Sequence, residues 1–344
     1  MVFSEDIPYW IHSTAEWWAN DSISDKEFIN AVEFLINNEI IVIQVGEISD
    51  SKEQKSIPSW VKQNAKWWSE NQINDDTFLQ GLKFLVELKI ININQVENEI
   101  INFSGDSTLF TKYAYKKDFR NINGQMIPIE SHFKLNEGME KTYEEIGFFN
   151  QKSDTVVVTP LFTSTAYWEP GFYSYYRGEC EEICLTKKID FEKPFGFSGS
   201  ESGFKILKLL NYHIVSDFEM AKNPQIINKY DKVILLHNEY VTKQMFETIT
   251  DHPKVVYLYP NALYGEVKFN EENETITLIR GHSYPSADVD NGFEWEFDNT
   301  RPYEFDSECL EWEFYEIDNG IMLNCYPENV LFTNFEMLKE IKEY

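Results

Sequence analysis

The first hundred residues carry a pattern of apolar positions that recurs with an offset of 50 residues. Ile7-Pro8-Tyr9-Trp10 matches Ile57-Pro58-Ser59-Trp60, and Trp17-Trp18 matches Trp67-Trp68. The register continues without a gap through Ile23 and Ile73, Asp25 and Asp75, Phe28 and Phe78, Phe34-Leu35 and Phe84-Leu85, and Ile40-Ile41 and Ile90-Ile91. A register held this long predicts a tandem duplication, with one copy over 1–48 and the other over 49–97.

Each copy is predicted to form a helical hairpin. Pro8 and Pro58 suit the first turn of a helix, where no amide donor is lost. Ser24 and Asn74 are candidate N-caps for the second helix. Each copy then ends in a short β-like run, at 40–43 and at 90–93. The paired tryptophans form either the core of each small unit or a platform on which a ligand stacks.

The pattern changes after residue 98. Residues 98–150 have weak periodicity and are interpreted as a connecting segment, with a possible β-hairpin around Gly124. From there an α/β domain is predicted over 151–344, because apolar β-branched runs alternate with helical patterns and this alternation is typical of a parallel sheet. The expected strands are 154–161, 212–215, 232–236, 254–259 and 320–325, the expected helices are 200–210, 224–229, 241–250 and 336–342, and a hairpin is expected at 269–279.

The charge balance excludes several partners. The 344 residues include 30 Lys and Arg against 58 Asp and Glu, a net charge of -28. Such a surface repels the phosphates of nucleic acid and anionic lipids. No run of about 18 apolar residues predicts a membrane span. The opening MVFSEDIPYW lacks the basic and apolar regions of a signal peptide, so the protein is either cytosolic or begins after a removed signal.

Four cysteines bear on the compartment. They fall as two locally spaced pairs, Cys180 with Cys184 and Cys309 with Cys325. A zinc site more often shows pairs separated by two residues, so the spacing favours two short-range disulfides. Disulfides imply an oxidising compartment.

Candidate chemistry lies where the predicted parallel strands end, because ligands bind at the carboxyl edge of open α/β sheets. The third strand of the domain ends in His237-Asn238-Glu239-Tyr240, and the fourth ends in Tyr259-Pro260-Asn261-Ala262-Leu263-Tyr264. We expect His237, Glu239, Tyr240, Asn261 and Tyr264 to converge there. The alternative is a helix cap followed by a solvated loop.

The sequence lacks the motifs of several common nucleotide-binding, hydrolase and zinc-protease sites. The sequence contains no G-x-G-x-x-G, no G-x-x-x-x-G-K-[ST], no G-x-S-x-G and no H-E-x-x-H motif. The Gly/Ser-rich stretch 195–200 either receives an anion at the start of the following helix or is a flexible connector.

The repeated segment IPxWxxxxAxWWxxxxIxxxxF resembles small repeats found ahead of many secreted or surface proteins of ammonia-oxidising archaea. This resemblance covers about residues 5–95. It implies an accessory module, or an interaction module that binds a protein partner, and a location outside the cell or on its surface. It implies no reaction.

A second resemblance concerns the α/β domain. The segments LLHNEYVT (235–242), YLYPNALYGEV (257–267) and NGFEWEFDN (291–299) resemble the C-terminal domain of the large (beta) subunit of N,N-dimethylformamidase. The resemblance implies a glutamine amidotransferase-like sheet and a mononuclear iron held by two tyrosines and one glutamate. It also implies hydrolysis of a small amide. Carried over, the ligands are Tyr240, Tyr264 and Glu294, with Glu296 and Glu266 as competing glutamates.

These residue types form a coherent set of candidates. Phenolate and carboxylate oxygens are hard ligands that suit Fe(III). Such an ion polarises an amide carbonyl and lowers the pKa of a bound water. His237, Glu239 and Asn261 are the catalytic candidates, with His237 or Glu239 moving the proton. The alternative is a non-catalytic extracellular or surface protein in which the α/β domain is a degenerate enzyme fold and the repeats bind.

Overall fold

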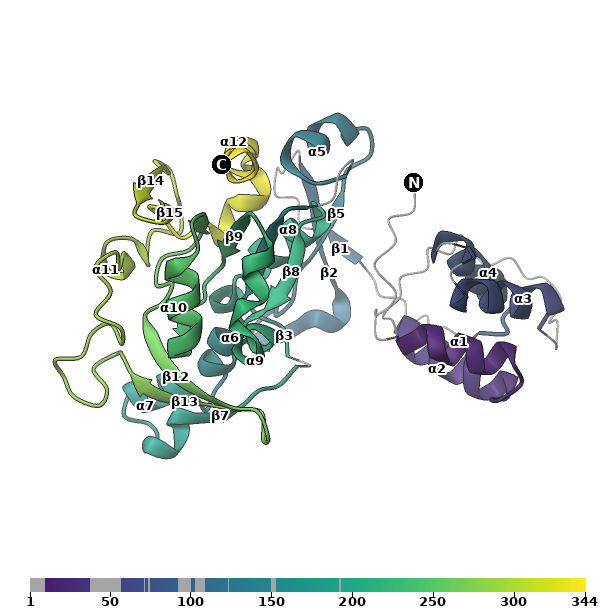
Figure 1. Cartoon of the computed structure of the whole chain (residues 1–344), viewed down its shortest axis with the longest axis horizontal. Coiled ribbons are helices and arrows are strands. Elements are labelled where there is room, and N and C mark those ends of the chain that lie inside the picture. Colours follow the sequence, from purple (N-terminus) through teal and green to yellow (C-terminus); the bar gives the residue numbers. More distant parts are fainter. Residues whose placement is uncertain are drawn as a thin grey trace. The chain divides into compact units, whose positions relative to one another are not determined.

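The computed structural model describes residues 10–37, 57–70, 72–73, 75–91, 100–102, 109–122, 124–149, 153–191 and 193–344. The chain divides into two compact units, 1–98 and 99–344. Each unit has its own hydrophobic core and is treated by itself (Figure 1). The β-like run expected at 40–43 lies outside the described residues, as do residues 92–93 and Asn74.

The first unit contains four described helices, α1 (Trp10–Ala19), α2 (Asp25–Asn37), α3 (Ser59–Ser69) and α4 (Asp75–Glu87). Ser24 caps α2, because its hydroxyl accepts from the Glu27 amide while the Glu27 carboxylate accepts from the Ser24 amide. No strand forms at Ile90 and Ile91. Both amides instead donate to the carbonyl oxygen of Leu85 and close the end of α4.

The paired tryptophans have different environments. Trp18 is buried and stacks on Phe28 with ring centroids 3.8 Å apart, and Trp68 stacks on Phe78 at 4.0 Å. Trp17 and Trp67 are exposed. Neighbouring residues of a helix point about 100° apart, so only one of each pair can face the shared core. The core interpretation therefore holds for the second tryptophan of each pair and is wrong for the first.

Residues 99–150 belong to the second unit. Strands β1 (Ile100–Asn102), β2 (Phe110–Tyr115) and β5 (His132–Leu135) form an antiparallel sheet. Strands β3 (Phe119–Ile122) and β4 (Gln125–Pro128) form the hairpin expected around Gly124. Its turn needs a glycine, because Gly124 has a φ of +86°. Helix α5 (Glu140–Ile146) follows.

The second unit is mixed α/β and is built on a six-stranded sheet. Its order is β14-β15-β11-β9-β6-β8, with only β14 antiparallel to its neighbour. The five expected strands are confirmed as the parallel strands of this sheet. They are β6 (Thr155–Thr159), β8 (His213–Ser216), β9 (Lys232–Leu235), β11 (Val255–Tyr257) and β15 (Gly320–Leu323). The antiparallel edge strand is β14 (Phe314–Ile317).

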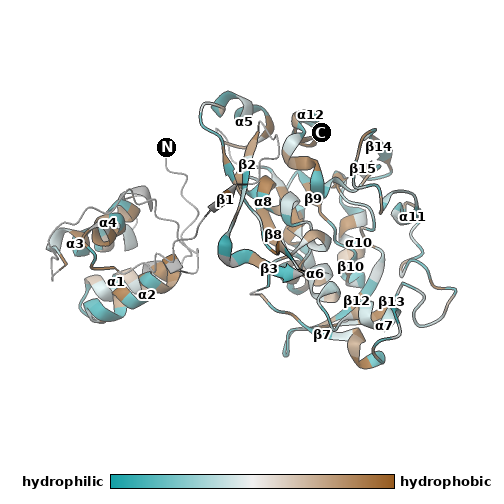
Figure 2. Ribbon diagram, turned by 180° about the vertical axis from the view of Figure 1, so that it is seen from behind, coloured by the Kyte–Doolittle hydropathy of each residue, from teal (hydrophilic) through white to brown (hydrophobic). Residues whose placement is uncertain are grey.

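Alternate side chains of these strands enter two cores. Val157, Ile234 and Val256 pack with α8 (Glu201–Leu209) and α12 (Phe335–Glu343) on one face. Val158 and Leu235 pack on the other face, with α6 (Leu161–Tyr167), α9 (Asp217–Lys222) and α10 (Lys243–Asp251). Both faces of the sheet are therefore covered, and Figure 2 shows hydrophobic colours on the ribbons of α6, α8 and α10.

A second, four-stranded sheet receives the chain after β9. Its order is β10-β12-β13-β7, and its strands are β10 (Tyr240–Val241), β12 (Gly265–Asn270), β13 (Thr275–Arg280) and β7 (Thr186–Lys188). The expected hairpin at 269–279 is the β12–β13 pair. Figure 1 shows β7, β12 and β13 at one end of the unit and β1, β2 and β5 at the other.

The shorter elements differ more from expectation. The polar aromatic stretch after β6, expected as a loop, contains α6 and α7 (Phe172–Tyr176). The helix expected at 224–229 is a 3-10 helix, η4 (Pro224–Lys229). The remaining described elements are η1 (Lys116–Asp118), η2 (Glu182–Leu185), η3 (Phe197–Gly199), α11 (Thr300–Tyr303), η5 (Pro327–Asn329) and η6 (Leu331–Thr333).

Both expected disulfides are present, Cys180 to Cys184 and Cys309 to Cys325. The second joins the loop after α11 to the residues that follow β15. Two disulfides suggest an oxidising environment. Among the described residues, no helix is long and apolar enough to cross a membrane.

Candidate functional site

Polar side chains gather where β9 ends, at the carboxyl edge of the large sheet. Two hydroxyls fix the backbone there: Ser200 Oγ accepts from the His237 amide, and Thr163 Oγ1 accepts from the amides of Glu239 and Tyr240. The chain after β11 turns back across this segment, and the amides of Tyr264 and Gly265 donate to the Glu239 carbonyl. The expected convergence of the two strand ends is therefore present in the backbone.

Glu239 lies at the centre of this group and is fully buried. Its Oε1 contacts Nε2 of His282 and accepts a hydrogen bond of 3.1 Å from the hydroxyl of Tyr173. Its Oε2 lies 3.5 Å from Nε2 of His237. A buried carboxylate thus has an imidazole on each side.

The charges explain how this group titrates. Burial by itself would raise the pKa of Glu239, but the neighbouring imidazole of His282 and its hydrogen bond, with a smaller effect of His237, bring that pKa below its ordinary value. Burial lowers the pKa of His237, and Glu239 only partly opposes this. The site at neutral pH therefore contains an ionised Glu239 beside a neutral His237.

Tyrosine rings surround His282. Its ring centroid lies 4.6 Å from that of Tyr264, 4.9 Å from that of Tyr176 and 5.9 Å from that of Tyr240. The hydroxyls of Tyr176 and Tyr240 are 3.3 Å apart. Burial, and then the negative charge of Glu239, raise the pKa of Tyr240 well above 10, so its phenol stays protonated at neutral pH.

The structure brings together most of the sequence-predicted residues. His237 and Glu239 face each other, and Tyr240 and Tyr264 both pack on His282. Asn261 lies on the turn after β11 with a φ of +65°. Its Nδ2 donates to the carboxylate of Glu304, 3.2 Å away.

Within the described part of the chain, none of the three predicted glutamate candidates is hydrogen-bonded to these groups. Glu294 forms an ion pair of 2.6 Å with Arg280, and its side chain is three-quarters exposed. Glu296 is exposed and Glu266 is half-buried. Neither of their carboxylates forms a hydrogen bond or ion pair within the described part of the chain.

Sequence reasoning missed His282, Glu304 and the tyrosines of α6 and α7. His282 follows β13 and has a φ of +52°. The next residue, Ser283, has a φ of +63°. Two successive non-glycine residues in the left-handed region are uncommon and are a recognised feature of functional loops. For the tyrosines, the density of these residues in 167–176 is the one signal that the sequence offers.

Several buried side-chain atoms after β9 and β11 have no hydrogen-bond partner among the described residues, and they include both polar atoms of the Asn238 side chain. Three others are acceptors on the sequence-predicted residues. They are Nε2 of His237, Oε2 of Glu239 and Oδ1 of Asn261. Buried polar atoms in native proteins almost always have a partner. Acceptors that lack a donor suit a bound cation or the N–H group of a ligand.

A second group with metal-binding chemistry lies elsewhere in the same unit. Asp118, Glu130 and His132 each offer one ligand atom, and these atoms all lie within 4.8 Å of one another. The group could hold a metal ion, and its three residues lie in 98–150, the expected connecting segment.

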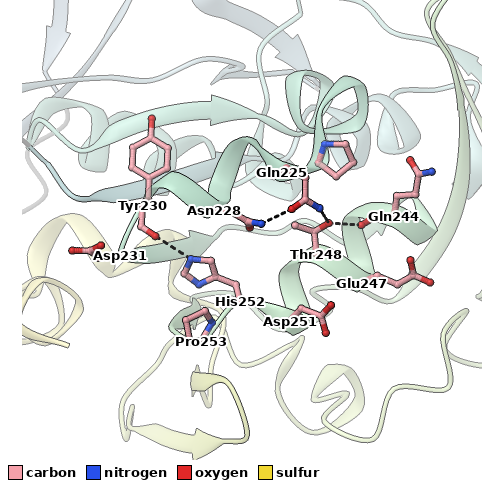
Figure 3. A pocket seen from close by; sticks show the side chains of 11 residues that line it. Gln225, Asn228, Tyr230, Asp231, Gln244, Glu247, Thr248, Asp251, His252 and Pro253 are labelled. Carbon is pink, nitrogen blue, oxygen red and sulfur yellow. Dashed lines mark hydrogen bonds between the residues drawn. The ribbon is translucent and has the colours of Figure 1, made fainter.

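A groove lies at the opposite edge of the sheet, where β9 and β11 begin (Figure 3). It has a volume of about 710 Å³ and lies between η4 and α10. Its only imidazole, His252, is fully engaged: Nε2 faces the Tyr230 carbonyl at 3.1 Å and Nδ1 accepts from the Lys254 amide. We place the chemistry at Glu239, because the groove lacks convergent groups of that kind.

Comparison with known proteins identifies no relative from which the role of this site could be inferred. No protein-family model matches the chain, and no curated protein matches it.

Proposed function

We propose that the second unit is a hydrolase of small amides in which Glu239 and His282 act as a pair. The observation that carries the proposal is the hydrogen bond between the buried carboxylate of Glu239 and Nε2 of His282. Because that nitrogen faces Glu239, Nδ1 is left as the proton acceptor. It forms no hydrogen bond within the described residues. A base oriented by a third group is the arrangement used to activate a nucleophile.

The reaction follows from these positions. The His282 side chain is one-fifth exposed, so water reaches it. A water molecule gives a proton to Nδ1 as its oxygen attacks the amide carbon. The same proton then passes to the leaving nitrogen as the carbon–nitrogen bond breaks, and a carboxylic acid and an amine result. The protonated phenol of Tyr240 is a donor suited to the negative charge that develops on the carbonyl oxygen, whereas the Tyr264 hydroxyl donates to Asp290 Oδ1 at 3.3 Å.

We include an iron ion in the proposal because the resemblance to the dimethylformamidase subunit implies one. The acceptor atoms without donors and the nearby phenols form a donor set that suits a hard cation. Tyr240 and Tyr264 would hold it. Glu239 would supply the carboxylate, since Glu294 pairs with Arg280 instead. A bound iron would supply positive charge that polarises the carbonyl.

The proposed fold family, the duplicated module and the extracellular location rest on the same resemblances. The six-stranded, mostly parallel sheet agrees with a glutamine amidotransferase-like fold. The matching Trp18–Phe28 and Trp68–Phe78 stacks support a duplicated module in the first unit. The two disulfides support a location outside the cell or on its surface.

The test is an amide hydrolysis assay on the full-length protein with its disulfides formed. The substrates are formamide, N-methylformamide and N,N-dimethylformamide, and the readouts are amine and formate. We expect His282→Gln and Glu239→Gln each to lower kcat by about 10²- to 10⁴-fold. His213→Gln, at an exposed position on β8, is the matched control and should retain full activity. Equal activity of His282→Gln and the wild type would disprove the proposed base.

Metal content is measured on the same preparations. Stoichiometric iron with a phenolate-to-metal absorption band, lost in Tyr240→Phe, would support the iron. Hydrolysis by a colourless, iron-free protein would retain Glu239 and His282 and remove the iron from the proposal.

A second function is favoured by one observation on the first unit. Trp17, Trp60 and Trp67 are each two-fifths or more exposed. Exposed tryptophans are typical of surfaces that bind partners. A protein with neither hydrolysis nor iron would favour the non-catalytic binding protein.

A further inference from the structure

We propose that Asp118, Glu130 and His132 form a structural binding site for a divalent first-row cation such as Zn²⁺ or Mn²⁺. The three residues come from separate elements of the second unit. Asp118 ends η1, Glu130 follows β4 and His132 opens β5. Their ligand atoms lie within 4.8 Å of one another. The site is distinct from the group around Glu239, with which it shares no residue.

The separation of the two least exposed donors already matches a coordination sphere. Nε2 of His132 lies 3.1 Å from Oδ2 of Asp118. Ligands about 2.1 Å from one ion are roughly 3.0 Å apart at an octahedral angle and roughly 3.4 Å apart at a tetrahedral angle. The two atoms are therefore already spaced as neighbouring ligands of one ion, and binding would replace their hydrogen bond with two bonds to the ion. A small rotation of the more exposed Glu130 side chain completes the third bond.

These donors are held in place by contacts that a cation does not disturb. Oδ2 of Asp118 accepts a hydrogen bond of 2.9 Å from the Tyr115 amide. The His132 ring packs against Tyr113 and Tyr115, with centroids 5.4 Å and 4.8 Å away. The carbonyl of Asp118 accepts from the Ile129 amide, which keeps the loop that carries Glu130 close. Such support of the ligands is what fixes a metal site.

Lys205 is the competing cation. Its ammonium group lies 2.9 Å from Oε1 of Glu130, 2.9 Å from Oε1 of Glu201 and 2.7 Å from the Ser131 carbonyl. Glu201 and Ser131 can hold this ammonium without Glu130, so the Glu130 carboxylate can turn to an ion. With Glu201 and Ser131 holding Lys205, the carboxylates of Asp118 and Glu130 together bring two negative charges to the site, which favours a divalent cation.

The donor types indicate the class of ion. One imidazole and two carboxylates suit Zn²⁺, Mn²⁺ or Fe²⁺ better than Ca²⁺ or Mg²⁺, which prefer oxygen alone. A bound ion would tie the end of η1 to the start of β5 and to the loop that carries Glu130. The expected effect is on stability.

The test is thermal unfolding and isothermal titration of the full-length, disulfide-bonded protein with ZnCl2 and with MnCl2. At a concentration 100 times its Kd, we expect the preferred cation to raise Tm by about 5 to 10 °C. Asp118→Asn, Glu130→Gln and His132→Gln should each abolish the rise. Glu130 is the safest variant for folding, because its side chain is one-third exposed. His213→Gln serves as the control.

The two metal proposals are separated by their variants. Tyr240→Phe should retain the Tm rise and the titration heat if the ion binds at His132. Loss of both in Tyr240→Phe but not in Glu130→Gln would place the ion at the other site and overturn this proposal. Absence of any binding to the wild type at millimolar Zn²⁺ or Mn²⁺ would overturn it as well, and the Asp118–His132 contact would then be an ordinary ion pair.

Discussion

The ring of Tyr240 lies against the backbone of Gly265, where a Cβ atom would come within 2.6 Å of the ring carbon Cδ1. The two residues are partners in the parallel register of β10 and β12. Tyr240 is fully buried and packs on Phe172 on another side, with centroids 5.1 Å apart. The absence of a side chain at Gly265 therefore determines where the phenol of Tyr240 lies in the site.

Gly265→Ala should displace this ring. We expect the free energy of unfolding to fall by about 1–3 kcal/mol, the range for an added methyl group in a packed core. Chemical denaturation measures it. Gly81→Ala is the control: the nearest atom to its added Cβ is 3.7 Å away, and alanine in a helix should stabilise the first unit by about 0.5–1 kcal/mol. An unchanged stability of Gly265→Ala would show that the ring moves at no cost.

The two adjacent tryptophans of α3 should differ sharply in how much each stabilises the first unit. Trp68 is buried against Phe78, so Trp68→Ala should destabilise the first unit by about 3–5 kcal/mol. Trp67 is two-fifths exposed, and Trp67→Ala should cost less than about 1 kcal/mol. Loss of helical circular dichroism on heating gives both values. Equal costs would contradict the assignment of one core tryptophan to each pair.

The buried strands and the edge that carries the site were predictable from local patterns. Runs such as Val156-Val157-Val158 are apolar on both faces, which is typical of a covered parallel strand. The residues after β9 and β11 could be located because parallel strands end at a common edge. The helix expected at 200–210 is present as α8, and it was predictable because one side of this segment is apolar and the other is polar.

Other features had no local signal. Helix α6 is buried on all sides, so its sequence has no apolar stripe from which a helix could be predicted. His282 lies 43 residues after Glu239, on a loop beyond a hairpin that belongs to another sheet. The contact between the two residues depends on how that sheet packs, which no spacing in the sequence encodes. The hydrogen bond between Asn261 and Glu304 likewise depends on tertiary packing and has no signal in the sequence.

The Cys309–Cys325 disulfide should stabilise the second unit more than the Cys180–Cys184 disulfide. The two close loops with sequence separations of 16 and 4. Loop-closure entropy then predicts losses of about 3 and about 2 kcal/mol when each pair is replaced by serine. Removing Cys309–Cys325 also releases the segment beside Glu304, so any amide hydrolysis should fall more in that variant. Equal melting temperatures and activities in both double variants would contradict this ranking.

The carboxyl group of Glu328 should make stability depend on pH. It is buried and accepts hydrogen bonds from the Tyr259 hydroxyl at 2.6 Å and from the Ser202 amide at 2.7 Å. Burial outweighs these bonds and raises its pKa from 4.5 to about 7. Between these values the unfolded chain releases the proton while the folded chain keeps it. The free energy of unfolding should therefore fall as pH rises from about 4.5 to 7 and then level off.

Glu328→Gln keeps the side chain neutral and removes this dependence. The stability of the variant minus that of the wild type should grow by up to about 3 kcal/mol between pH 4.5 and 8, since a pKa difference of one corresponds to about 1.4 kcal/mol. Urea denaturation at a series of pH values gives both curves. Glu296→Gln, at an exposed position, should leave the dependence unchanged. A constant difference between Glu328→Gln and the wild type would show that Glu328 ionises equally in the folded and unfolded chains.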